Sequence, residues 1–181
     1  MKLTETTVKE TVLYRGRIVT LRCDDVTLPD GKPAKREVVE HIGGVGVLPL
    51  TDDGNVLLVR QFRYPYKEEL LEIPAGKRDS KDEEPLETGK RELKEETGAS
   101  ADRYTYLGKV YPSPGYTGEV IHIYLAEGLT YGETCPDEDE FLNLEKIPFE
   151  KALAMVYDGT LTDSKTQIAL MKAAKILADR A

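Results

Sequence analysis

Apolar and polar residues alternate along residues 1–40. Val19, Leu21 and Cys23 are separated by single polar residues, and Pro-Asp-Gly follows at positions 29–31. A period of two places successive side chains on opposite faces of a strand, and Pro-Asp-Gly favours a tight turn. We therefore predict a small antiparallel sheet at the N-terminus, in front of a main domain.

The main domain begins with two almost continuous apolar runs, at residues 45–50 and 56–63, on either side of Asp-Asp-Gly-Asn. Apolar runs of this length around an Asp-Gly turn predict a buried β-hairpin. Shorter apolar segments predict further strands at residues 70–75, 104–111 and 120–126.

Helical periodicity replaces alternation towards the C-terminus. Residues 149–157 and 164–178 are predicted to be helices, and either residue of Asp-Ser at 163–164 suits the cap of the second helix. Strands first, with helices interspersed, predict an α+β fold. We expect an N-terminal β segment at residues 1–40 and a main domain at residues 41–181.

The most informative stretch for function is Arg-Glu-Leu-Lys-Glu-Glu-Thr-Gly at residues 91–98. On an α-helix, with 100° between successive residues, Glu92, Glu95 and Glu96 fall within about one quadrant of the surface. Like charges at this spacing destabilise a helix by roughly 0.2–0.5 kcal/mol per pair. Mg²⁺ prefers oxygen ligands and shares them with substrate phosphates, so bound cations would explain the stripe.

The acidic stripe lies within a segment whose residues signal a loop, then the start of a helix, and then the end of that helix. Gly76 opens a polar loop, Pro85 suits the first position of a helix, and Gly98 suits the position just after its end. Leu86 and Leu93 are seven residues apart, which marks one face of this helix as core-directed.

This segment resembles the box of Nudix hydrolases, Gly-x5-Glu-x7-Arg-Glu-U-x-Glu-Glu-x-Gly-U, in which U is a bulky apolar residue. Every charged position of the box is present from Glu83 onward. Six residues rather than five separate Gly76 from Glu83, and Asp82 would restore this spacing only by breaking the next one. Ala99 is smaller than the family prefers, and Gly89 costs about 1 kcal/mol relative to alanine inside a helix.

Other motifs resemble the ADP-ribose pyrophosphatase branch of this family. They are a proline fifteen residues beyond the box, in Ser-Pro-Gly at 113–115, and the segments at 35–39, 61–65 and 71–76. The resemblance extends over most of the chain and implies the Nudix α/β/α sandwich around a mixed sheet. It also implies metal-dependent hydrolysis of ADP-ribose to AMP and ribose 5-phosphate.

The resemblance implies a metal site with two or three Mg²⁺ or Mn²⁺ ions. Glu92 and Glu96 would hold the ions, Glu95 and Glu83 would support them, and the carbonyl of Ala75 would contribute an oxygen. From the residues alone, the alternative interpretation is a solvated acidic face of the helix.

The resemblance also implies contacts with the substrate. Arg63 and Arg36 would bind the diphosphate, which suits the forked guanidinium group. Glu72 would be an accessory metal ligand or a residue that supports the ligands. Each of these charges has a structural alternative, since solvated charges at strand ends and on edge strands are common.

Two loops complete the set of candidates. Gly115 and Tyr116 follow the Ser-Pro motif and are candidates for substrate contact, and Tyr116 or Tyr14 would stack on adenine unless it serves packing. In the acidic segment Asp-Glu-Asp-Glu after Pro136, the resemblance implies that Glu138 or Glu140 activates water. Solvent-exposed surface charge is the alternative for this segment.

Composition narrows the possible partners. The chain has 181 residues, 40% of them hydrophobic, and a net charge of −8 that argues against nucleic acid as the main partner. Cys23 and Cys135 lack the spacing of metal ligands, and neither a signal peptide nor an apolar run of about 20 residues suggests a membrane. We expect a cytoplasmic protein, and the resemblance implies a homodimer formed through the N-terminal sheet.

Two other functions stay open at the level of sequence. The substrate could be another nucleoside diphosphate sugar, such as GDP-mannose or ADP-glucose. The chain could also be a Nudix-like sensor that binds ADP-ribose without cleaving it. Such sensors usually carry an added helix-turn-helix domain and an eroded box, whereas the box carboxylates are all present here.

Overall fold

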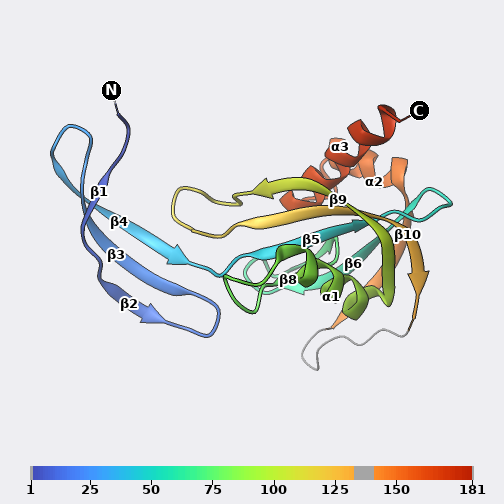
Figure 1. Ribbon diagram of the computed structural model, residues 1–181, viewed down its shortest axis with the longest axis horizontal. Coiled ribbons are helices and arrows are strands. Elements are labelled where there is room, and N and C mark those ends of the chain that lie inside the picture. Colours follow the sequence, from blue (N-terminus) through green and yellow to red (C-terminus); the bar gives the residue numbers. More distant parts are fainter. Residues whose placement is uncertain (1, 133–140, 181) are drawn as a thin grey trace. The chain divides into compact units, whose positions relative to one another are not determined.

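The computed structural model describes residues 2–132 and 141–180. The chain divides into two compact units, each with its own sheet structure. The first unit comprises residues 1–43 and 111–120, and the second comprises the remainder of the chain. Figure 1 shows the elements of both units, coloured along the sequence.

The first unit is an antiparallel sheet of four strands, β1 (Thr6–Lys9), β2 (Val12–Arg15), β3 (Thr20–Thr27) and β4 (Pro33–Glu40). β3 pairs with each of the other three strands. Gly31, with a φ of 86°, makes the turn between β3 and β4. The segment at 111–120 joins this unit at Val39, whose N–H donates to the carbonyl of Tyr116 at 2.7 Å. The predicted N-terminal antiparallel sheet is confirmed.

The second unit contains two sheets. The first has the strand order β8 (Ala75–Lys77), β5 (Gly44–Pro49), β10 (Ile121–Tyr131), β9 (Ala99–Val110). It is mixed, because β5 and β10 are parallel while the other pairs are antiparallel. The second sheet is antiparallel and has the order β11 (Leu142–Pro148), β6 (Asn55–Arg63), β7 (Glu68–Glu72). The α+β class and the mixed sheet expected from the sequence are confirmed.

The hairpin predicted for residues 45–50 and 56–63 is wrong. The two segments meet at a bridge between Leu50 and Val56. Beyond this bridge, β5 belongs to the mixed sheet and β6 to the antiparallel sheet. β5 pairs with β8 and β10, whereas β6 pairs with the following strand β7 and with β11.

Three helices complete the second unit, α1 (Pro85–Thr97), α2 (Phe149–Tyr157) and α3 (Ser164–Ala178). Their bounds follow the predicted signals. Gly98 ends α1 with a φ of 69°, and the side chain of Asp163 caps α3 by accepting from the N–H of Thr166. Within the described part of the chain, every helix is too short or too polar to cross a bilayer.

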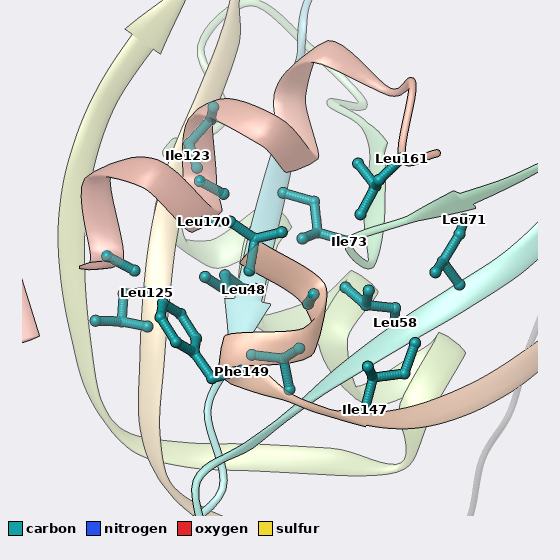
Figure 2. Close-up of a cluster of buried hydrophobic side chains, with 14 of the residues drawn as sticks. Leu48, Leu58, Leu71, Ile73, Ile123, Leu125, Ile147, Phe149, Leu161 and Leu170 are labelled. Carbon is teal, nitrogen blue, oxygen red and sulfur yellow. The ribbon is translucent and has the colours of Figure 1, made fainter. Parts of the chain in front are cut away.

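The helices cover the sheets through two apolar clusters. One cluster contains Leu48, Leu58 and Ile73, together with Phe149 of α2 and Leu170 of α3 (Figure 2). The other contains side chains of α1, β5, β6, β9 and β10, namely Val45, Val47, Leu57, Leu93, Ala99, Tyr124 and Ala126. Because β5 contributes to both clusters, α1 packs on one face of the mixed sheet and α3 packs on the other, while α2 contacts α3 and the antiparallel sheet.

Close packing brings α1 against β5 at a glycine. A Cβ added at Gly89 would lie 3.0 Å from methyl groups of both Val45 and Val47. Real Cβ atoms rarely approach this closely, so a larger residue would push the helix away from the strand. The helix-weakening glycine therefore has a packing role, and it sets how near the acidic stripe of α1 lies to the sheet.

Candidate active site

Two buried carboxylates of α1 lie against the short strand β8. Glu92 and Glu96 are 6% and 3% exposed, respectively. The backbone N–H of Ala75 donates to Oε2 of Glu96 at 3.0 Å. A Cβ added at Gly76 would overlap the carboxylate of Glu92. The glycine that opens the motif is thus needed for the close approach between β8 and the helix carboxylates.

Arg91 pairs with two members of the acidic stripe. Its Nη1 lies 2.8 Å from Oε1 of Glu92 and 3.0 Å from Oε2 of Glu95. Burial opposes the charge of Arg91, but the carboxylates of Glu92 and Glu95 outweigh burial and raise its pKa. The Glu95 side chain is 31% exposed, so this carboxylate sits at the rim of the cluster while Arg91 holds it in place.

The loop before α1 accommodates the extra residue of the motif. Oε2 of Glu83 accepts from the N–H of Asp79 at 2.6 Å, and Nε of Arg78 donates to the carbonyl of Glu83 at 3.1 Å. The hydrogen bond from Asp79, together with the charges of Arg91 and Arg78, lowers the pKa of Glu83. Glu83 therefore closes the loop at the start of the helix, with its carboxylate turned back to the backbone of that loop.

Arg63 and Glu72 form a bidentate pair at the ends of β6 and β7. Nε of Arg63 donates to Oε1 of Glu72 and Nη2 donates to Oε2, both at 2.6 Å. The Glu72 side chain is 1% exposed and that of Arg63 is 38% exposed. The hydrogen bonds to Glu72 raise the pKa of Arg63, and the charge of Glu96 contributes to this shift. Among the carboxylates of α1, the one whose charge reaches Arg63 is that of Glu96.

Lys165, which no sequence pattern marks as a site residue, contacts the same glutamate. Its Nζ donates to Oε2 of Glu72, and to Oδ1 of Asp163 at 3.0 Å. Burial alone would raise the pKa of Glu72, but hydrogen bonds and charges from Arg63 and Lys165 lower it. Lys165 is 93 residues from Glu72 in the sequence, and its position after a capping aspartate indicates only a helix start.

The candidates in the N-terminal unit have partners within that unit. Arg36 donates from Nε to Oε2 of Glu5 at 2.9 Å. The Tyr116 carbonyl accepts from Val39, while its side chain is 58% exposed. Gly115 belongs to the same segment, and the ring of Tyr14 on β2 is exposed. The substrate contacts expected of Arg36, Gly115, Tyr116 and Tyr14 from the sequence stay predictions.

Glu138 and Glu140 lie outside the described residues. Within residues 2–132 and 141–180, no three His, Cys, Asp or Glu side chains form a group that could hold a metal ion. Glu92 and Glu96 nevertheless fit a divalent cation, because two buried carboxylates beside the backbone of β8 offer only hard oxygen donors. Mg²⁺ is usually held by one or two carboxylates, with waters and substrate phosphates as its other ligands.

Comparison with known families agrees with this geometry. Residues 28–167 match the NUDIX domain family. The chain belongs to the Nudix family. Residues 5–39 also match the family described as nucleoside diphosphate sugar hydrolase N-terminal domain. The two matches together cover the N-terminal sheet and the segment that contains Glu92 and Glu96.

Two relatives of this Nudix protein align over most of its length. It is 42% identical over 170 residues to the ADP-ribose pyrophosphatase of Bacillus subtilis (strain 168), covering 93% of this chain and 91% of the relative. It is 41% identical over 168 residues to the methanol dehydrogenase activator of Bacillus methanolicus, covering 92% and 90%. A solved structure described as an ADP compounds hydrolase has the same fold, with a TM-score of 0.87 and 24% identity over 100% of this chain and 98% of that one.

Proposed function

We propose that the protein is a metal-dependent pyrophosphohydrolase that cleaves ADP-ribose to AMP and ribose 5-phosphate. The observation that carries this proposal is the buried pair Glu92 and Glu96 against β8, where the N–H of Ala75 donates to Glu96. The 42% identity to an ADP-ribose pyrophosphatase over 93% of the chain supports the choice of substrate.

The proposed metal site consists of Glu92, Glu96 and the carbonyl of Ala75, supported by Glu95 and Glu83. It would bind two or three ions, Mg²⁺ or Mn²⁺. When bound, such ions neutralise diphosphate oxygens and lower the pKa of a coordinated water to near neutrality. Burial suits the two principal carboxylates to this task, because a carboxylate removed from water gains most from a nearby cation.

The side chains of the protein supply substrate binding and orientation. A guanidinium group has five N–H donors, and Glu72 occupies two of those of Arg63. The partly exposed remainder of this group is proposed to bind the diphosphate. Arg91 keeps Glu92 and Glu95 in fixed positions, so the carboxylates do not have to reorganise when substrate enters.

Further contacts in this proposal come from the N-terminal unit and the acidic segment. Arg36 would bind the diphosphate together with Arg63, Gly115 would contact the substrate, and Tyr116 would stack on adenine, with Tyr14 as the alternative. Glu138 or Glu140 would accept the proton of the attacking water. Replacing each of these two glutamates by glutamine tests that role, because the residue that takes the proton should lose kcat while KM changes little.

The proposal includes a homodimer in the cytoplasm. Strands β1 and β2 are exposed along their whole length, and they carry large apolar side chains: Val8 is 68% exposed and Leu13 is 59% exposed. These exposed apolar side chains support the proposal that this sheet carries the dimer interface. The net charge of −8 supports a small substrate rather than nucleic acid. Light scattering of the purified protein measures the oligomeric state.

Turnover of a panel of nucleotide sugars tests the proposed reaction. ADP-ribose, ADP-glucose and GDP-mannose are offered at equal concentration with Mg²⁺ or Mn²⁺, and products are identified by mass. We expect the highest kcat/KM for ADP-ribose, with AMP and ribose 5-phosphate as products. A higher value for another sugar nucleotide would change the assigned substrate. Binding of ADP-ribose without cleavage would instead establish a sensor.

A further inference from the structure

Lys165 is a buried lysine at the start of α3, and it has no role in the function proposed above. The Lys165 residue is 8% exposed. Lysine is almost never buried without a partner, and Lys165 has two, since its Nζ donates to Oε2 of Glu72 and to Oδ1 of Asp163. These two contacts occupy an ammonium group whose side chain is only 10% exposed.

Glu72 is shared between two cations. Its Oε1 accepts from Nε of Arg63, and its Oε2 accepts from both Nη2 of Arg63 and Nζ of Lys165. With Asp163, the set contains two positive and two negative side chains. The charges therefore balance inside the protein, and Arg63 keeps the donors that do not face Glu72.

The same end of α3 also fixes the backbone that leads to β8. The hydroxyl of Thr166 accepts from the N–H of Ile73 at 2.8 Å and donates to Oδ2 of Asp163 at 2.5 Å. Two residues after Ile73, the N–H of Ala75 donates to Glu96. The start of α3 thus contacts both the side chain of Glu72 and the backbone of Ile73, which leads into β8.

We infer that Lys165 is a positioning residue that holds Arg63 in the orientation needed to bind the diphosphate; this inference rests on the proposed function. Without the ammonium group, Asp163 loses its cation and Oε2 of Glu72 loses a donor. Both carboxylates already act on Arg63 through their charges. Arg63 would then turn towards Glu72 and Asp163, because a buried carboxylate such as Glu72 is costly without its partner.

Direct contact between Lys165 and substrate is a weaker explanation. The ammonium group is buried and donates to two carboxylates, whereas Arg63 is the more exposed member of the set. The influence of Lys165 on substrate therefore passes through Glu72. This path predicts an effect on KM rather than on the chemical step.

Steady-state kinetics of Lys165→Met, Lys165→Gln and Lys165→Arg test this inference. We expect the methionine and glutamine variants to raise KM about 10-fold, because they weaken a charge-assisted contact made through Arg63. We expect kcat to change less than about 3-fold and the Mg²⁺ concentration for half-maximal activity to be unchanged. Arginine should restore most of the loss. Lys172→Met is the matched control, since Lys172 lies on the same helix and its Nζ donates to the carbonyl of Leu107.

A double-mutant cycle with Arg63→Ala separates positioning from simple destabilisation. If Lys165 acts through Arg63, the double variant should have nearly the same KM as Arg63→Ala alone. Additive effects, or a KM unchanged from wild type in soluble Lys165 variants, would overturn the inference. Should the methionine variant fail to fold, the glutamine and arginine variants give the same comparison.

The wild-type protein distinguishes failure of this inference from failure of the proposed function. KM is measured with whichever nucleotide sugar of the panel it cleaves best, so a different substrate leaves the comparison intact. If wild type cleaves none of them, the dissociation constant of ADP-ribose, measured by calorimetry without metal, replaces KM. Equal dissociation constants for wild type and Lys165→Met would then refute the positioning role.

Discussion

Glu92, Glu95 and Glu96 share one stripe of α1, but their surroundings differ. Glu92 and Glu96 are buried against β8, whereas the side chain of Glu95 is about one-third exposed and pairs with Arg91. A buried carboxylate is costly unless it is paired, hydrogen-bonded or bound to a cation. The stripe therefore contains two candidate ligands and one rim residue, although all three have the same chemistry.

Replacing either buried carboxylate by its amide is expected to abolish most activity. In Glu92→Gln and Glu96→Gln, kcat should fall about 100-fold or more at saturating Mg²⁺, because an amide keeps the shape but lacks the charge that the ion requires. Circular dichroism should show an unchanged fold. Glu87→Gln is the control on the same helix, since Glu87 pairs with Lys90 at the surface. A near-normal kcat in Glu92→Gln or Glu96→Gln would refute the assignment of these carboxylates as metal ligands.

Arg63→Ala is expected to weaken substrate binding without changing the metal requirement. Charge-assisted hydrogen bonds contribute about 1.5–3 kcal/mol, so kcat/KM should fall roughly 10- to 100-fold. Arg60→Ala is the matched control, because Arg60 lies on the same strand and pairs with Glu145. Melting temperatures check that the loss is not caused by unfolding around Glu72. Equal kcat/KM for Arg63→Ala and wild type would assign Arg63 a structural role.

The three-residue strand β8 determines the geometry of the site. Its first residue, Ala75, donates to Glu96, and its second, Gly76, lies on the carboxylate of Glu92. β8 is held in register by antiparallel pairing with β5. The contact between strand and helix therefore depends on the missing side chain of one glycine.

Gly76→Ala should consequently impair catalysis more than stability. The new methyl group would displace the carboxylate of Glu92, so we expect kcat to fall about 10- to 100-fold, comparable to the loss of a residue that orients a metal ligand. Gly132→Ala is the control, since a Cβ there would lie 3.8 Å from its nearest neighbour, the carbonyl of Gly98. Equal kcat for both alanine variants would show that the site tolerates displacement of the Glu92 carboxylate.

Local signals explain which elements the sequence could predict. Pro85, Gly98 and Asp163 determine helix ends within their own turns, and the predicted helices agree with the structure. The hairpin prediction failed because β5 pairs with β8 and β10, and β6 pairs with β7 and β11, so the two strands join different sheets. The acidic stripe could be recognised from spacing within one helix, whereas the contact of Lys165 with Glu72 joins residues 93 positions apart. Composition and periodicity carry no information about such a pair.

The residues that follow α3 are tied to the mixed sheet by charge. Glu127 on β10 is 9% exposed. Its Oε1 lies 2.8 Å from Nη2 of Arg103 on β9 and 2.9 Å from Nη1 of Arg180 after α3. The hydrogen bond from Arg103, followed by that from Arg180, lowers the pKa of Glu127. One carboxylate thus joins two strands to the end of the last helix.

This cluster predicts a pH-dependent contribution to stability. Because the pKa of Glu127 is lowered from its usual 4.5 in the folded state, the contribution is present above that pH and is lost as pH falls through the folded-state value. Glu127→Gln should lower the melting temperature by about 2–4 °C at pH 7, and the difference should shrink towards pH 3. Glu150→Gln, on the exposed side of α2, is the control. A difference that is constant with pH would exclude ionisation of Glu127 as the cause.

The contact of Gly89 with Val45 and Val47 also limits how this sequence can change. Alanine would improve the helix propensity of α1 by about 1 kcal/mol, yet its methyl group would come within 3.0 Å of both valines. A gain in local helix stability thus requires a smaller side chain on the strand, which opens space elsewhere in the core. Positions 45, 47 and 89 are therefore coupled through packing, and a larger residue at position 89 calls for a compensating change at the valines.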